Sequence, residues 1–192
     1  MTIEKTKATD VVSSGLTCNT KAGEAAQATG VYRVECHDKD GNLKWEAQSK
    51  NLVVNVGLQY MAGSALTSVA QITTWYLGLY GAGAANTPAA GDTMASHAGW
   101  TEVTAYSNAN RVTATFVTAT TADPSVVTNT ASPAVFNING TATVGGAFLT
   151  SENTKGGTTG TLFSAADFGA PGDRNVVNSD TLSVTYTFSL AA

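Results

Sequence analysis

A period-two alternation of apolar and polar residues marks two stretches of the chain as β-strands. In residues 134–149 the even positions are apolar or glycine, whereas the odd positions at the centre carry Asn and Thr. Residues 181–190 repeat the pattern, with Leu, Val, Tyr and Phe alternating with Thr and Ser. Such stretches have one apolar face, which a second layer of structure must cover. Because residues 134–149 are long for one strand and include three glycines, they predict two successive strands or one strand bent at a sheet corner.

Turn-forming residues divide the rest of the chain into further short strands. Asp40-Gly41, between two strand-like runs, is typical of a β-hairpin turn, and 170–173 predicts the turn into the last strand. The run at 74–80 has apolar groups on both faces, so we expect it at the centre of a sheet. The other predicted strands are 31–36, 43–47, 51–56, 100–103, 111–118 and 161–165.

Only Gly57–Leu66 predicts a helix, because apolar residues recur there at helical spacing, with Asn55 as a candidate N-terminal cap. The stretches 81–99 and 119–132 are predicted loops, and the glycine-rich stretch 153–160 is a predicted flexible hairpin tip. A loop as long as 81–99 is usually functional or lies against another surface.

These elements predict an all-β fold, an antiparallel β-sandwich of jelly-roll or related Greek-key type, with eight to ten strands and one short helix. We place this domain at residues 31–192. Residues 1–30 are poor in large apolar groups and cannot offset the entropy of ordering alone. They are interpreted as a disordered tail or, as we expect, an extended N-terminal arm that orders against a neighbouring subunit or another partner.

The low share of charged residues narrows the possible partners. Charged residues make up 12% of the 192 residues, about half the usual share, and apolar residues make up 43%. Residues 1–50 carry no net charge, and residues 51–192 carry three Lys/Arg against seven Asp/Glu, a net charge of −4. Without a basic patch, we expect no nucleic-acid binding. Without an apolar run of about 20 residues or an apolar leader, we expect no membrane insertion and no secretion.

Candidate catalytic groups are few. His97 lies near Asp92 and Ser96 in the sequence, but triad members are neighbours in space rather than in sequence, so we expect His97 to bind backbone in a loop. The small number of acids after residue 50 gives little support to a glycosidase carboxylate pair. Cys18 and Cys36 permit one disulfide, but a chain without a leader is expected to keep both as free thiols.

Asp38, Asp40 and Asn42 match the first three ligand positions of a calcium loop. The match then fails, because Leu43 stands where the loop needs Gly and Ser49 where it needs Glu. We therefore interpret this segment as a structural turn.

An aromatic platform for sugars could be built from Trp75, Tyr76, Tyr80, Trp100 and Tyr106. Aromatic residues in strands are more often part of a core or an interface, and we expect a core here. We predict no catalytic, cofactor-binding or metal-binding residue.

Four long segments carry a resemblance to a known family. They are Asn51–Met61, Trp75–Tyr80, Asp92–Arg111 and Ala134–Phe168. Through them, residues 31–190 resemble small virion structural proteins of tailed bacteriophages, of the capsid decoration or cement type. The resemblance implies no active site and no cofactor. It implies a homo-dimer or homo-trimer, made in the cytoplasm of the bacterial host, that binds the major capsid protein on the exterior of the capsid.

Two other classes stay open. One is a phage neck, tail or receptor-binding (carbohydrate-binding) module that would use the aromatic residues. The other is a hydrolase with a carboxylate pair that the sequence does not reveal.

Overall fold

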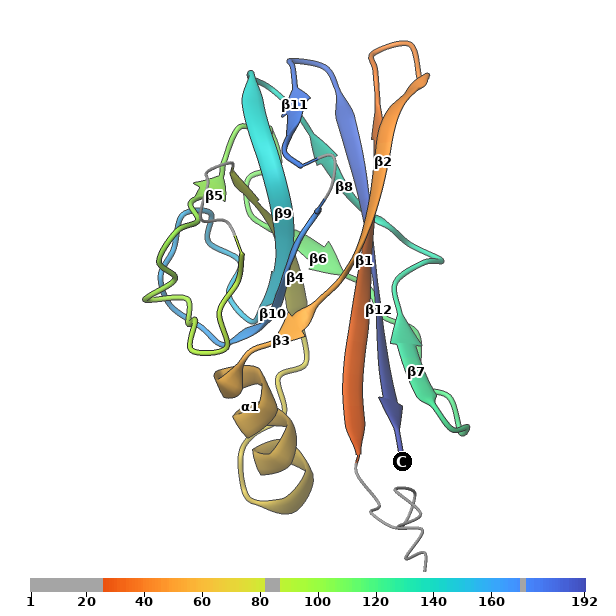
Figure 1. The fold of residues 1–192 in the computed structure, drawn as a ribbon, viewed down its shortest axis with the longest axis vertical. Helices are drawn as coiled ribbons and strands as arrows, with labels where there is room; N and C mark the ends of the chain where they lie inside the picture. The colour runs from red at the N-terminus through yellow and green to blue at the C-terminus, as the bar shows by residue number, and fades with distance from the viewer. Residues whose placement is uncertain (1–25, 82–86, 170–171) are drawn as a thin grey trace, which may run out of the picture.

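The computed structural model describes residues 26–81, 87–169 and 172–192. It confirms the predicted β-sandwich: two antiparallel sheets face each other, and one helix lies at one end (Figure 1). The first sheet consists of β1 (Gln27–His37), β2 (Leu43–Lys50), β7 (Ser125–Thr128), β8 (Ala134–Asn137) and β12 (Thr181–Ala191). The second consists of β3 (Leu52–Val53), β4 (Trp75–Gly81), β5 (Glu102–Val103), β6 (Val112–Ala114), β9 (Ala142–Thr150), β10 (Leu162–Asp167) and β11 (Arg174–Val176).

The two longest strands, β1 and β12, pair along their whole length at the centre of the first sheet. The strand order is β2-β1-β12-β7, and β8 pairs with the beginning of β12. The register runs from Gln27 opposite Ala191 to His37 opposite Thr181. Alternation along β12 buries Leu182, Val184 and Tyr186, as its sequence predicts. The beginning of β1 and the end of β12 therefore lie at the same end of the sandwich (Figure 1).

Residues 134–149 form two successive strands that belong to different sheets. β8 pairs with β12 in the first sheet, whereas β9 lies between β10 and β4 in the second. In β8 the alternation holds, because Ala134 and Phe136 are buried and their neighbours are exposed. In β9 it ends, because every residue from Val144 to Thr150 is buried.

The second sheet is apolar on both faces, which explains that continuous burial. Leu77 of β4 and Leu149 of β9 face the first sheet across the main core. Tyr80 and Phe148, on the same two strands, belong to a separate cluster on the outer face. Each of these rings packs on a glycine directly opposite, Tyr80 on Gly146 and Phe148 on Gly78. A β-carbon at either glycine would overlap the ring, so the close approach depends on glycine.

The segment 87–101 covers this outer face. Met94 and Trp100 are buried in the outer cluster beside Tyr80 and Phe148, and the segment lies along that side of the sheet in Figure 1. The described part of the predicted loop 81–99 therefore lies against the protein's own sheet, one of the two outcomes that its length predicts.

Several predicted elements need correction. The predicted strand at 51–56 is only the two-residue β3, because the helix α1 (Asn55–Leu66) begins inside it. Asn55 is the first helical residue and not the cap; Val54 holds the cap position without a side-chain hydrogen bond. The predicted loop 119–132 contains β7. The described residues form twelve strands rather than eight to ten, since β7 and β11 are too short to show a period and were not predicted.

The strand β1 begins at Gln27, four residues before the predicted start of the domain at residue 31 and inside the predicted arm of residues 1–30. The greater part of that arm, residues 1–25, lies outside the described residues.

The glycine contacts of the second sheet predict that the same glycine-to-alanine change lowers the free energy of unfolding at one position and hardly changes it at another. Gly146→Ala should lower the free energy of unfolding by about 1–3 kcal/mol, because the new methyl group overlaps the Tyr80 ring and the Ala166 carbonyl oxygen. Gly140→Ala is the matched control, with Ala105 as its nearest neighbour at 3.6 Å, and should change it by less than about 1 kcal/mol. Urea unfolding of both variants measures the difference; equal midpoints would contradict the packing described.

Candidate functional site

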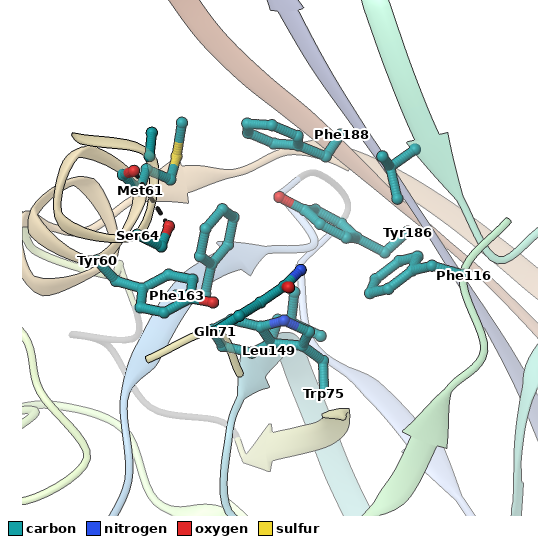
Figure 2. A pocket seen from close by; sticks show the side chains of 12 residues that line it. Tyr60, Met61, Ser64, Gln71, Trp75, Phe116, Leu149, Phe163, Tyr186 and Phe188 are labelled. Carbon is teal, nitrogen blue, oxygen red and sulfur yellow. Dashed lines mark hydrogen bonds between the residues drawn. The ribbon is translucent and has the colours of Figure 1, made fainter. Parts of the chain in front are cut away.

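A cavity of about 500 Å³ opens at the end of the sandwich where α1 lies. Its walls come from both sheets and from the helix, as Figure 2 shows, with Tyr60 and Met61 on α1 facing Phe116, Tyr186 and Phe188 across the opening. We call it the α1-end cavity. Its lining consists of Tyr60, Met61, Ser64, Ala65, Gln71, Trp75, Phe116, Val127, Leu149, Phe163, Tyr186 and Phe188.

The position of α1 over the sheets follows from a close contact at its first turn. Gly57 is buried against β10, where a β-carbon would overlap the carbonyl oxygen of Phe163. The Tyr60 hydroxyl accepts a hydrogen bond from the backbone N–H of Ile72 at 2.8 Å, which ties the chain after the helix to the helix itself. Tyr60 and Phe163 also each pack edge-to-face against Trp75.

The hydroxyl of Tyr186, on the cavity wall, is already hydrogen-bonded. The hydroxyl of Tyr186 accepts from Asn51 Nδ2 at 2.7 Å and lies 3.3 Å from the Ser164 hydroxyl. Burial raises the pKa of Tyr186 well above that of a free tyrosine, so the phenol stays neutral. Among the described residues that line the cavity, no side chain is charged or a histidine. This lining suits an apolar ligand or protein segment, and the hydroxyl groups of Tyr60, Ser64 and Tyr186 are already engaged in hydrogen bonds within the protein.

Exposed apolar side chains lie on α1, which forms one wall of the cavity, and on the segment after it. Leu66 is 86% exposed at the end of α1, and Leu58 and Val69 are about half exposed. These residues belong to the run from Asn51 to Gly91, which contains no Asp, Glu, Lys, Arg or His. One end of the sandwich thus presents an aromatic cavity beside a segment without charged side chains, and the sequence analysis did not identify it. The long gap between charged residues was the signal that could have revealed it.

The structure does not assemble the candidate triad. Asp92 accepts the indole N–H of Trp100 and the backbone N–H of Ala89, so its carboxylate is not directed at His97. His97 stacks on Trp100 with ring centroids 3.8 Å apart, and its Nδ1 lies 3.0 Å from the Trp100 carbonyl oxygen. A carbonyl accepts only, so this nitrogen carries the hydrogen. The expected backbone-bonding role of His97 is confirmed.

The Asp38–Asn42 segment is the structural turn that the sequence predicts. The Asp38 carboxylate accepts the backbone N–H groups of Asp40 and Asn42, each at 2.9 Å, and these bonds hold the pKa of Asp38 below its usual value. Gly41 has a φ of +84°, which glycine adopts readily.

Cys36, at the base of this hairpin, is a buried free thiol whose pKa is raised to about 11, first by burial and then by Asp180. Cys18 lies outside the described residues.

The five aromatic residues considered as a sugar platform are dispersed. Tyr80 and Trp100 are buried on the outer face of the second sheet, and Tyr106 is buried in the main core against Phe136. Trp75 is half-buried in the α1-end cavity, and Tyr76 is half-buried on the same strand. The expected core role is thus confirmed for Tyr80, Trp100 and Tyr106.

The predicted flexible tip at 153–160 is held by a buried ion pair that the sequence analysis missed. Arg111 is 2% exposed and binds both carboxylate oxygens of Glu102, at 2.9 and 2.7 Å. The same guanidinium donates to the carbonyl oxygens of Glu152 and Gly157, and the Glu102 carboxylate accepts the N–H of Gly156. The pair therefore fastens the tip through three hydrogen bonds to its backbone, which makes this a structural centre.

Neither a metal site nor a membrane-spanning element is found in the described part of the chain. No group of three or more His, Cys, Asp or Glu side chains there could hold a metal ion. The single described helix is too short to cross a membrane.

Comparisons with known proteins add no relative. No protein-family model matches the chain, and no curated protein or solved structure shows significant similarity to it.

The burial of the Arg111–Glu102 pair predicts a strong effect on stability. Arg111→Met should lower the free energy of unfolding by about 3–5 kcal/mol, because it leaves the Glu102 carboxylate buried without its partner. Arg33→Met is the matched control, since Arg33 pairs with Glu35 and Glu46 on the exposed face and should contribute less than about 1 kcal/mol. Chemical denaturation of both variants tests this, and a control as damaging as Arg111→Met would refute it.

Proposed function

We propose that this protein is a non-enzymatic structural protein of a bacteriophage virion, which binds the assembled capsid from outside and stabilises it. The observation that carries the proposal is the aromatic cavity at the α1 end of the sandwich, beside the uncharged run 51–91. The proposal also draws on the resemblance of residues 31–190 to capsid decoration proteins. In this account the partners are the major capsid protein and further copies of the chain, in a homo-dimer or homo-trimer.

The α1 end has the composition of an interface core. Cores of protein interfaces are depleted of charged residues and enriched in aromatic residues and Met, because charged groups are costly to desolvate. The cavity walls carry Tyr60, Met61 and Trp75, and the exposed Leu58 and Leu66 lie next to them. The run 51–91 has no charged side chain, so binding through it requires no charged group of this run to lose its hydration.

The surrounding segments indicate the extent of this surface. β7 pairs with the end of β12 and contributes Val127 to the cavity wall, so the stretch 119–132, which includes Asp123, borders the α1 end and is a second contact candidate. The described part of the loop 81–99 is a weaker candidate than its sequence predicts, because Met94 and Trp100 are used inside the protein.

The stabilising effect follows from mass action. A protein that binds only the assembled shell stabilises it further as its concentration rises above the dissociation constant. An oligomer that bridges several capsid subunits gains effective concentration at each additional contact, so weak individual contacts suffice.

The test uses two identical substitutions at opposite ends of the sandwich. Leu66→Lys places a charge on the α1 end, whereas Leu43→Lys places one beside the turn that follows β1. Both side chains are exposed, so neither change should unfold the protein. Capsid particles that lack the protein are incubated with each variant, and bound protein and DNA release on heating are measured. We expect Leu66→Lys to bind at least about tenfold more weakly, a loss of about 1.4 kcal/mol, and Leu43→Lys to bind normally.

Two outcomes would overturn the proposal. One is unchanged DNA release whether or not the wild-type protein is present. The other is a copy number of a few per virion with the protein confined to the tail or neck, which would favour the receptor-binding alternative.

A further inference from the structure

The α1-end cavity matches one segment of the chain's own N-terminal part. We propose that the segment Val11–Leu16 occupies this cavity in the same molecule. The proposal rests on charge, reach and effective concentration, and it does not depend on the proposed function.

Charge selects the segment. The cavity lining contains no charged side chain, so a ligand that carried a charge into it would lose hydration without gaining a partner. In residues 1–26 the longest uncharged run is Val11–Thr20, between Asp10 and Lys21. It contains Val11, Val12 and Leu16, the aliphatic side chains that an aromatic cavity would accept.

Reach permits the contact. β1 begins at Gln27, and three residues later Gly30 lies opposite Phe188, which lines the cavity. The ten residues 17–26 between the segment and β1 span at most about 33–36 Å. The chain can therefore turn back to the cavity with length to spare. The opposite end of the sandwich lies a full eleven-residue strand away, about 36 Å, and would require the tether to be fully extended.

Effective concentration favours the same molecule over a second copy. A short linker gives a tethered segment an effective concentration on the order of millimolar at its site. A second copy in solution at micromolar concentration competes poorly against this. The filled cavity would then join Leu58 and Leu66 in one continuous apolar surface, while the charged residues before Val11 stay outside it.

Disulfide trapping in the full-length chain tests the proposal. The background variant Cys18→Ser leaves only the buried Cys36 thiol. The test pair adds Ser14→Cys, within the segment, and Ala65→Cys on the exposed cavity rim. The control pair adds Ser14→Cys and Lys39→Cys, which is equally exposed but lies two residues beyond the far end of β1. Electrophoretic mobility and peptide mapping follow intramolecular disulfide formation under mild oxidation.

We expect the test pair to close at least about tenfold faster than the control pair, as an intramolecular bridge. Adding Val11→Ser and Val12→Ser should slow the test pair to the control rate, because the apolar side chains hold the segment in place. Equal rates for the two pairs would overturn the proposal, as would a test pair that is insensitive to the two serine substitutions. Bridges formed only between two chains would also overturn it and would assign the cavity to a second copy.

Discussion

The packing of Tyr80 and Phe148 on glycines of the neighbouring strand is the constraint on which the rest of the structure depends. It brings β4 and β9 together with apolar rings on the face that points away from the first sheet. A sheet that is apolar on both faces needs a cover on each. The first sheet covers the inner face, and the segment 87–101 covers the outer one through Met94 and Trp100. The long segment 87–101 therefore contributes to the protein's own stability by packing on the second sheet.

This commitment leaves the α1 end as the place where exposed apolar side chains adjoin an open cavity. The helix closes one side of the sandwich through Gly57, but its exposed side chains include Leu58 and Leu66, and an aromatic cavity remains beneath it. Elsewhere on the described surface, the exposed apolar side chains Leu43, Val135 and Val177 do not line this cavity. The long loops near Arg111 are fastened by its buried pair with Glu102, and the outer face of the first sheet carries Thr, Ser and exposed ion pairs. A binding function is therefore proposed for the α1 end.

The sequence predicts those strands in which one face is buried and the other is exposed to solvent. The alternation in 181–190 and the Asp-Gly turn are both found, as is the break in 134–149, where the chain changes sheets. It fails where tertiary contacts decide. Asn55 reads as a cap but lies inside the helix, and β7 has too few residues to show a period. Arg111 and Glu102 are nine residues apart and no local pattern pairs them, while the cavity joins residues from Tyr60 to Phe188.

The central claim is that the α1 end, with its aromatic cavity, is the surface that meets a partner. Hydrogen–deuterium exchange of the full-length protein, free and bound to capsid particles, tests it most directly, since backbone amides buried at an interface exchange more slowly. The account predicts added protection in peptides covering residues 54–72 and 119–128, and none in the β1–β2 hairpin around residues 37–43. Protection at the hairpin with no change around α1 would contradict it.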